Sequence, residues 1–358
     1  MTLRAFTRRR PLVVVVAAAA TAAAIFVGIA YAGGPASPGQ GRGPETYTIG
    51  LFGDMPYNAL GRSQYPSLLA DLNGSNAAFS IFDGDLKAGG DGPCSDPLYF
   101  TALDHFNSLE RPLIFVPGDN DWTDCWGRYG PATQPFSDPE ERLNFERALF
   151  FSTDRSLGQH TLKVTRQAVE GYPENQRWKR GPVVYLGLNV QGSNDNFPYR
   201  DTEAGTGVPV RSDAEIQRQR NEEMARKAAD FRWLEEGFDY ANRVNAKGVM
   251  IVWQADPNFN NEQHLTNPHD FDAYADYIDE LRRVTEAFSG QVVLVHGDSH
   301  YFKVDKPLNR TTGGGVLGNF TRVETFGSRN THWVKARIDP NDPNVFIFEP
   351  RIVPANAQ

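Results

Sequence analysis

Residues 113–121 read LIFVPGDND and join a short apolar run to a Gly-Asp turn. The same layout recurs at 79–85 (FSIFDGD) and at 292–300 (VVLVHGDSH). Runs of β-branched and aromatic residues are typical of buried strands, and a glycine lets the backbone turn sharply where the strand ends. Each of these stretches therefore predicts a strand that delivers a carboxylate at its carboxyl end.

Outward from these runs, predicted strands and helices alternate along most of the chain. Strands are predicted at 46–52, 79–82, 113–116, 183–188, 249–253 and 292–295, and helices at 65–72, 99–108, 139–149, 212–244 and 271–288. Three more strands, at 320–325, 332–338 and 345–348, follow without helices between them. Alternation predicts a largely parallel sheet covered by helices, and the strand-rich end predicts a second sheet. We therefore expect a two-sheet α/β sandwich.

The composition limits the class of protein. The chain has 358 residues, 40% of them hydrophobic, and a formal net charge of -8. That is enough apolar material for a packed core, and the acidic balance predicts no nucleic-acid-binding patch, which would need a basic face. With only two cysteines, neither a zinc-finger framework nor a disulfide-dense mini-fold is available.

The first 32 residues have the layout of a secretory signal. Four arginines within residues 4–10 precede an apolar run over 12–32, which ends in Ala-Tyr-Ala. The arginines also resemble a twin-arginine signal, so export to the periplasm or outside the cell could use either the Sec or the twin-arginine route. The alternative is an uncleaved membrane anchor, because the run is long enough to span a bilayer.

This N-terminal interpretation sets the expected organisation of the chain. A Gly/Pro-rich linker over 33–45 follows the signal, a single domain occupies 46–350, and a short tail covers 351–358. Contact with a membrane is expected only if the N-terminal segment stays uncleaved.

Five of the six early strands end in an oxygen or imidazole side chain. In open α/β sheets ligands bind at the carboxyl ends of strands, so these side chains should meet at one edge. One Gly-Asp pair alone would indicate a turn or a helix N-cap. Five such endings at equivalent positions favour a metal site instead, and they are Gly53-Asp54, Gly84-Asp85, Gly118-Asp119, Gln254 with Asp256, and Asp298 with His300.

In the order of these motifs the chain resembles the calcineurin-like metallophosphoesterases. That family carries D-x-H, G-D, G-N-H-[DE], a lone histidine and G-H-x-H in this order and at similar spacing. The resemblance covers nearly the whole chain after the N-terminal segment. It implies the two-sheet α/β/β/α fold, a small phosphomonoester or phosphodiester substrate, and two divalent metal ions.

Four histidines of the family motifs are replaced in this chain. Their positions hold Pro56, Asn120, Gln254 and Asp298, while Asp119 stands at the position of the family's asparagine. In the family, the histidine at the position of Asn120 assists the leaving group. An asparagine can bind a phosphate oxygen there, but it cannot donate a proton in the same way.

The resemblance implies a role for each remaining site residue. One metal is assigned to Asp54, Asp85 and His300, and the other to Asp85, Asp119, Gln254 and Asp298. Asp85 would bridge the two ions, and the catalytic residues would be Asn120, Asp85 and His300. Because most of these ligands are hard oxygens, Mn²⁺, Mg²⁺, Ca²⁺ or Fe²⁺ is expected in preference to Zn²⁺.

Nitrogen-bearing side chains near these motifs could complete the site. Four aspartates in one cage would repel one another without a positive charge, which metal ions or Lys87 would supply. His296 is either a core residue or a further ligand. His264 and His269, in the loop after Gln254, are either surface residues or additional ligands.

The two cysteines are predicted to pair. Cys94 follows the second strand and Cys125 follows the third, so adjacent strands would bring their loops together. In an oxidising compartment such a pair forms a disulfide. A thiolate metal site is the alternative.

Two functions remain open from the sequence. The first is an exported, metal-dependent phosphoester hydrolase. The second is a catalytically degenerate relative that keeps the fold and binds a metal ion or an anion, which the loss of four histidines favours.

Overall fold

The computed structural model describes residues 45–89, 94–125, 138–197, 212–259 and 272–357. All of them belong to one structural unit, Gly43–Gln358. The predicted signal and nearly all of the linker lie outside the described residues, as do His264 and His269. In the described ranges no helix is long and apolar enough to cross a membrane.

The first of two β-sheets has five strands in the order β12-β11-β1-β2-β3. Its three early strands are parallel, and the two late strands add to the β1 edge in antiparallel fashion. The strands are β1 (Tyr47–Phe52), β2 (Ala77–Phe82), β3 (Leu113–Phe115), β11 (Trp333–Ile338) and β12 (Phe346–Arg351).

The second sheet has seven strands in the order β4-β5-β6-β7-β8-β10-β9. Its centre, from β6 through β7 and β8 to β10, is parallel, and its edges are antiparallel. The strands are β4 (Thr165–Gln167), β5 (Tyr172–Arg180), β6 (Val183–Gly187), β7 (Gly248–Val252), β8 (Gln291–His296), β9 (Lys303–Asp305) and β10 (Phe320–Glu324).

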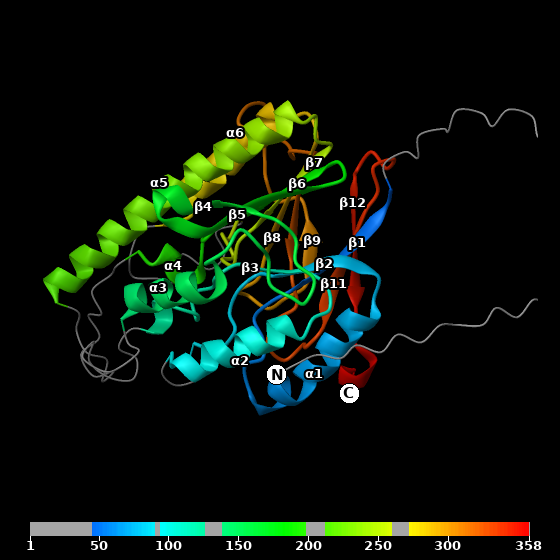
Figure 1. Cartoon of the computed structure of the whole chain (residues 1–358). Coiled ribbons are helices and arrows are strands. Elements are labelled where there is room, and N and C mark those ends of the chain that lie inside the picture. Colours follow the sequence, from blue (N-terminus) through cyan, green and yellow to red (C-terminus); the bar gives the residue numbers. More distant parts are fainter. Residues whose placement is uncertain (1–44, 90–93, 126–137, 198–211, 260–271, 358) are drawn as a thin grey trace, which may run out of the picture. The chain divides into compact units, whose positions relative to one another are not determined.

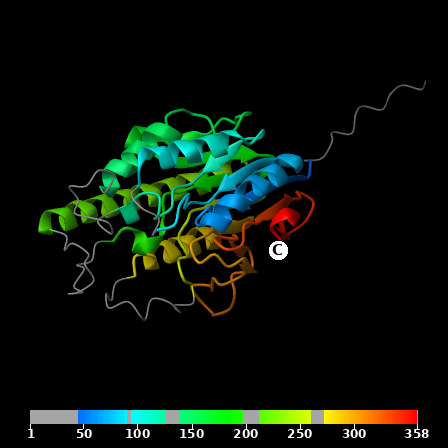
Figure 2. The same ribbon diagram turned by 90° about the horizontal axis from the view of Figure 1, so that it is seen from below.

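Helices cover the outer face of each sheet (Figures 1 and 2). The first sheet packs against α1 (Ala59–Gly74), α2 (Asp96–Asn107) and α3 (Pro139–Phe150). The second sheet packs against α5 (Asp213–Arg243) and α6 (Ala275–Ala287). Shorter elements are α4 (Gly192–Asp195), η1 (Thr123–Cys125), η2 (Ala168–Glu170) and η4 (Pro354–Asn356).

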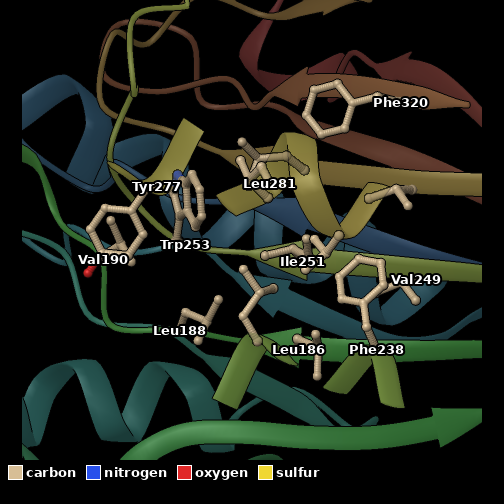
Figure 3. Packing of buried hydrophobic residues seen from close by; sticks show 14 of the residues in the cluster. Leu186, Leu188, Val190, Phe238, Val249, Ile251, Trp253, Tyr277, Leu281 and Phe320 are labelled. Carbon is tan, nitrogen blue, oxygen red and sulfur yellow. The ribbon is translucent and has the colours of Figure 1, made fainter. Parts of the chain in front are cut away.

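Alternating residues of the strands build the layers. In β7, Met250 and Val252 point between the two sheets, whereas Val249 and Ile251 point toward α5 and α6. Figure 3 shows this outer cluster, with Ile251 among side chains from both helices. Such alternation follows from the two-residue period of a strand. The layers confirm the predicted two-sheet α/β sandwich.

Most differences from the sequence-based expectation lie at polar elements. The helix expected at 65–72 begins at Ala59, because the Asn58 side chain accepts a hydrogen bond from the Gly61 N–H and caps it. Strand β5 was not predicted, since its sequence YPENQRWKR has no apolar run. Hydrogen bonds to distant residues satisfy its buried polar side chains. For example, the Gln176 Nε2 donates to the Phe115 carbonyl at 2.6 Å.

The C-terminal residues pack with the domain. The residues assigned to a tail include the end of β12 at Arg351, and Val353 is buried in the cluster beneath α1. The Asn356 side chain donates hydrogen bonds to the carbonyls of Gln64 and Thr331.

Candidate functional site

Sharp turns at the strand ends aim the predicted side chains at one another. Asp54, Asp85, Asp298 and His300 have backbone φ angles of 51°, 67°, 74° and 65°. This left-handed conformation is unfavourable for residues other than glycine, and it persists only where the surroundings hold it in place. Strain of this kind clusters at functional sites.

Close packing of the turns requires glycine at one position in particular. A Cβ atom on Gly118 would lie 2.1 Å from the Asp85 Oδ1. The turn after β3 can therefore approach the carboxylate after β2 only because residue 118 has no side chain.

Asp85 lies at the centre of the site and is 1% exposed. Its Oδ2 accepts a hydrogen bond from the Tyr57 hydroxyl at 2.6 Å and another from the Asn120 side-chain amide. Its Oδ1 accepts from the Asn120 backbone N–H at 3.0 Å. Both oxygens of the residue predicted to bridge two metals are thus engaged with protein donors.

Asp54 joins the first strand end to the last. It is fully buried, and its Oδ1 lies 3.2 Å from the Tyr57 hydroxyl and 3.5 Å from the His300 Nε2. Its Oδ2 accepts from the Asp298 N–H at 3.0 Å. The Asp298 carboxylate in turn accepts from the Asp256 N–H at 3.3 Å.

Asp119 connects the site to the segment after β6. Its Oδ2 accepts from the Ser193 hydroxyl at 2.7 Å. Its Oδ1 is buried and has no hydrogen-bond partner among the described residues. The neighbouring Gly192 N–H donates to the Gln254 Oε1, whereas the Gln254 Nε2 has no partner there. All six predicted ligand residues are therefore brought together at one edge.

Asp121 ties two of the strand ends together. Its Oδ2 accepts from the N–H groups of Asp85 and Gly118 at 2.9 and 2.7 Å, and its Oδ1 accepts from the Leu86 N–H at 2.7 Å. Burial raises the pKa of Asp121 to about 6, against the lowering effect of these donors. The carboxylate positions the turns that carry Asp85 and Asp119.

Burial and mutual repulsion oppose ionisation of the cluster. Burial, with added repulsion from Asp119 and Asp54, holds the pKa of Asp85 well above its usual range. Burial raises the pKa of Asp119 to about 7, and Asp124 adds to the rise. The pKa of Asp298 is raised in the same way, by burial and then by Asp119 and Asp54. Within the described ranges, His300 is the only side chain that could carry a positive charge in ion-pair contact with this cluster.

The charge of His300 depends on Asp54. Burial acts against protonation of the imidazole, but the hydrogen bond and the charge of Asp54 outweigh it and raise the pKa of His300. A protonated His300 would balance one carboxylate charge and leave the others uncompensated.

The types of side chain at the site favour binding of a metal ion, but within the described residues their arrangement does not form a complete set of ligands. Four carboxylates and a buried, unpartnered Asp119 oxygen suit a hard divalent cation. In the part of the chain that the structure covers, however, no three His, Cys, Asp or Glu side chains are positioned together as ligands of one ion. In this arrangement Tyr57 and Asn120 donate hydrogen bonds to both oxygens of Asp85.

Two residues predicted as possible additions lie beside the site. His296 in β8 is fully buried, with Nδ1 2.9 Å from the Gly297 carbonyl oxygen and no partner for Nε2 in the described structure. Lys87 is 2% exposed, and its Nζ donates to the Ala88 carbonyl at 3.1 Å. The charge of Lys87 lowers the pKa of Asp121.

The predicted disulfide is confirmed. Cys94 and Cys125 are bonded, with their Cα atoms 5.6 Å apart. The bond links the loops after β2 and β3, the two elements that carry Asp85 and Asp119.

Sequence reasoning missed three side chains of the site: Tyr57, Asp121 and Ser193. Tyr57 follows Asp54 by three residues in Gly-Asp-Met-Pro-Tyr, and Asp121 stands in the motif that supplied Asp119. Proximity to these motifs was the available signal. Ser193 follows a strand whose end carries no predicted ligand, so only the tertiary structure reveals it.

Comparisons with known proteins concern the fold alone. No family model matches the chain, and no curated protein matches it. Similar solved structures include a dimetal phosphatase from Danio rerio, at 13% identity and a TM-score of 0.49, covering 86% of this chain and 96% of that one. GAP50, the anchor in the inner membrane complex of Plasmodium, aligns at 9% identity and a TM-score of 0.48 over 87% and 86% of the two chains. PhoD aligns at 12% identity and a TM-score of 0.47 over 85% and 66%. Similarity this weak carries no argument about activity.

Proposed function

We propose that this chain is an exported phosphoester hydrolase that requires divalent cations. The observation that carries the proposal is the convergence of four carboxylates, Asp54, Asp85, Asp119 and Asp298, from four separate strand ends. Buried carboxylates in contact need positive charge to remain ionised, and His300 supplies at most one.

The residues that would hold the cations are those that the sequence resemblance assigns. By that assignment Asp54, Asp85 and His300 would hold one cation, and Asp85, Asp119, Gln254 and Asp298 would hold the other. A bound divalent cation would polarise a phosphoryl oxygen and lower the pKa of a water molecule.

The chain's own groups set a limit on the substrate. The Asn120 amide can donate a hydrogen bond to a phosphoryl oxygen, and the exposed Ser193 hydroxyl can orient an ester at the mouth of the site. Neither is a proton donor comparable to histidine. We therefore expect faster turnover of esters with stable leaving groups, such as aryl phosphates, than of alkyl phosphates.

A second candidate is supported by a separate observation. Asp85 already accepts three hydrogen bonds, from Tyr57 and Asn120. If this arrangement persists when ligands are present, the protein would be a non-catalytic binder of a metal ion or an anion.

Substitution of Asp85 separates the two candidates. The purified chain, stripped with a chelator, is assayed on 4-nitrophenyl phosphate and bis(4-nitrophenyl) phosphate with Mn²⁺, Mg²⁺, Ca²⁺ and Zn²⁺ in turn. We expect turnover with at least one of the first three ions and a loss of more than about 100-fold in Asp85→Asn.

The matched control is Asp279→Asn, which removes the same charge from an exposed ion pair on α6 and should keep full activity. Absence of turnover on either ester with every ion would reject the hydrolase. Retained metal binding in that case would support the non-catalytic binder.

A further inference from the structure

A neutral hydroxyl group lies between the two carboxylates at the centre of the site. The Tyr57 side chain is 7% exposed, and its hydroxyl is 2.6 Å from the Asp85 Oδ2 and 3.2 Å from the Asp54 Oδ1. It also accepts a hydrogen bond from the Asn120 Nδ2 at 3.1 Å. With a single proton to donate, the hydroxyl can satisfy only one carboxylate at a time.

Packing and a backbone hydrogen bond hold Tyr57 in place. Its ring packs edge-to-face with the ring of His300, with centroids 5.2 Å apart and planes at 69°. The Tyr57 carbonyl accepts a hydrogen bond from the Arg62 Nη1 at 2.6 Å. The hydroxyl is therefore placed by the backbone and by packing, as well as by its own hydrogen bonds.

A cation that bridges the Asp54 Oδ1 and the Asp85 Oδ2 would need this same position, because these are the two oxygens that the hydroxyl contacts. Divalent ions bind carboxylate oxygens at about 2.0–2.6 Å, so such an ion would lie at least as close to both oxygens as the hydroxyl does now. The hydroxyl and the cation cannot both occupy that space. Because the hydroxyl is neutral, it satisfies hydrogen bonds but leaves the charge of the carboxylates uncompensated.

We infer that Tyr57 is a built-in occupant of the cation position between Asp54 and Asp85, and that a divalent ion binds there only when the hydroxyl withdraws. The inference rests on the proposed function, because it concerns the same ions. It adds that the chain itself weakens its affinity for them. Removing the hydroxyl should therefore tighten cation binding.

The test compares Mn²⁺ binding by the wild type and by Tyr57→Phe, using calorimetric titration of the full purified chain. The expected result is an affinity at least about tenfold higher in Tyr57→Phe, the equivalent of one hydrogen bond to a charged group. The increase in Tm on adding Mn²⁺ should also be larger in this variant. Tyr65→Phe is the matched control, since Tyr65 is a buried tyrosine that packs on His105, and its Mn²⁺ affinity should equal that of the wild type.

A second measurement needs no folded variant. Withdrawal of the hydroxyl should change the near-ultraviolet tyrosine spectrum of the wild type when Mn²⁺ is added. Equal affinity in Tyr57→Phe, weaker affinity, or an unchanged wild-type spectrum at saturation would each overturn the inference while leaving the proposed metal dependence intact. Absence of Mn²⁺, Mg²⁺ and Ca²⁺ binding in both the wild type and Tyr57→Phe would overturn both.

Discussion

The packing around Gly84 leaves no space for a side chain at this strand end. Its φ is 110°, and a Cβ atom would lie 2.6 Å from the Gln254 Cγ and 2.9 Å from the Gly118 Cα. Both the backbone conformation and the contacts exclude a side chain. We expect Gly84→Ala to lower the free energy of unfolding by about 2 kcal/mol or more, measured by urea denaturation.

Gly74 is the control for this substitution. It lies in the last turn of α1 without a positive φ, and beyond its chain neighbours and its own helix backbone no atom lies within 4 Å of a Cβ built there. Gly74→Ala should be neutral or slightly stabilising. Equal losses in the two variants would show that the strand-end packing has no special role.

Single residues also mark the limit of sequence reasoning about the site. Asp54, Asp85 and Asp119 could be found because each directly follows an apolar run and stands beside glycine. Tyr57 could not be identified as a site residue in this way, since a tyrosine after a turn is as typical of the core as of a functional site. Its role depends on distances to two carboxylates that come from different strands.

At the level of secondary-structure elements, the disulfide joins two loops that carry site residues. It closes a loop of 31 residues between the segments that follow β2 and β3. In the chain-entropy model a loop of this size stabilises by roughly 3–4 kcal/mol. The double substitution Cys94→Ala and Cys125→Ala should lower the free energy of unfolding by about this amount, again measured in urea.

Thiol titration gives an independent check of the bond. The chain purified and denatured without reductant should show no free thiol, because both cysteines are in the bond. Finding two free thiols, or a double variant that unfolds at the wild-type urea midpoint, would contradict a stabilising bridge.

The turn at α4 could not be predicted from the sequence, because contacts with distant elements determine its conformation. Four consecutive residues, Ser193 to Asn196, have φ angles between 51° and 60°, a left-handed run that L-residues disfavour. Contacts from distant elements hold it: the Arg226 guanidinium donates to the Asp195 carboxylate at 2.7 Å and to the Asp195 carbonyl at 2.9 Å. The local sequence does not indicate this conformation, because residues of α5 stabilise it. This turn brings the Ser193 hydroxyl into hydrogen-bond contact with Asp119.

Export is the prediction that concerns the whole molecule. In a bacterial host the chain should be found outside the cytoplasm, starting near Gly33 and with its cysteines bonded. Deleting residues 2–32 should leave it in the cytoplasm with free thiols. Cell fractionation with mass spectrometry measures both. A membrane fraction holding the intact 39.8 kDa chain would instead indicate an uncleaved anchor.

At the same scale, the sequence by itself determined the architecture. Apolar runs at strand spacing, separated by amphipathic helices, predict both sheets and their covering layers, because burial depends on a periodicity that local sequence displays. It also located the edge where the acidic side chains meet, since parallel strands end on the same side. The polar strand β5, second from the edge of its sheet, was missed, because its polar side chains are held by hydrogen bonds to distant residues and it contains no apolar run.

Only the tertiary structure decided how the acidic residues are used. The sequence predicted that Asp54, Asp85 and Asp119 converge, but their hydrogen-bond partners Tyr57, Asn120 and Ser193 emerge from folding. The physical reason is the distance along the chain over which each interaction is determined. Hydrophobic periodicity is a property of neighbours along the chain, whereas hydrogen bonds and charge repulsion at the site depend on a few ångströms between residues from different strands.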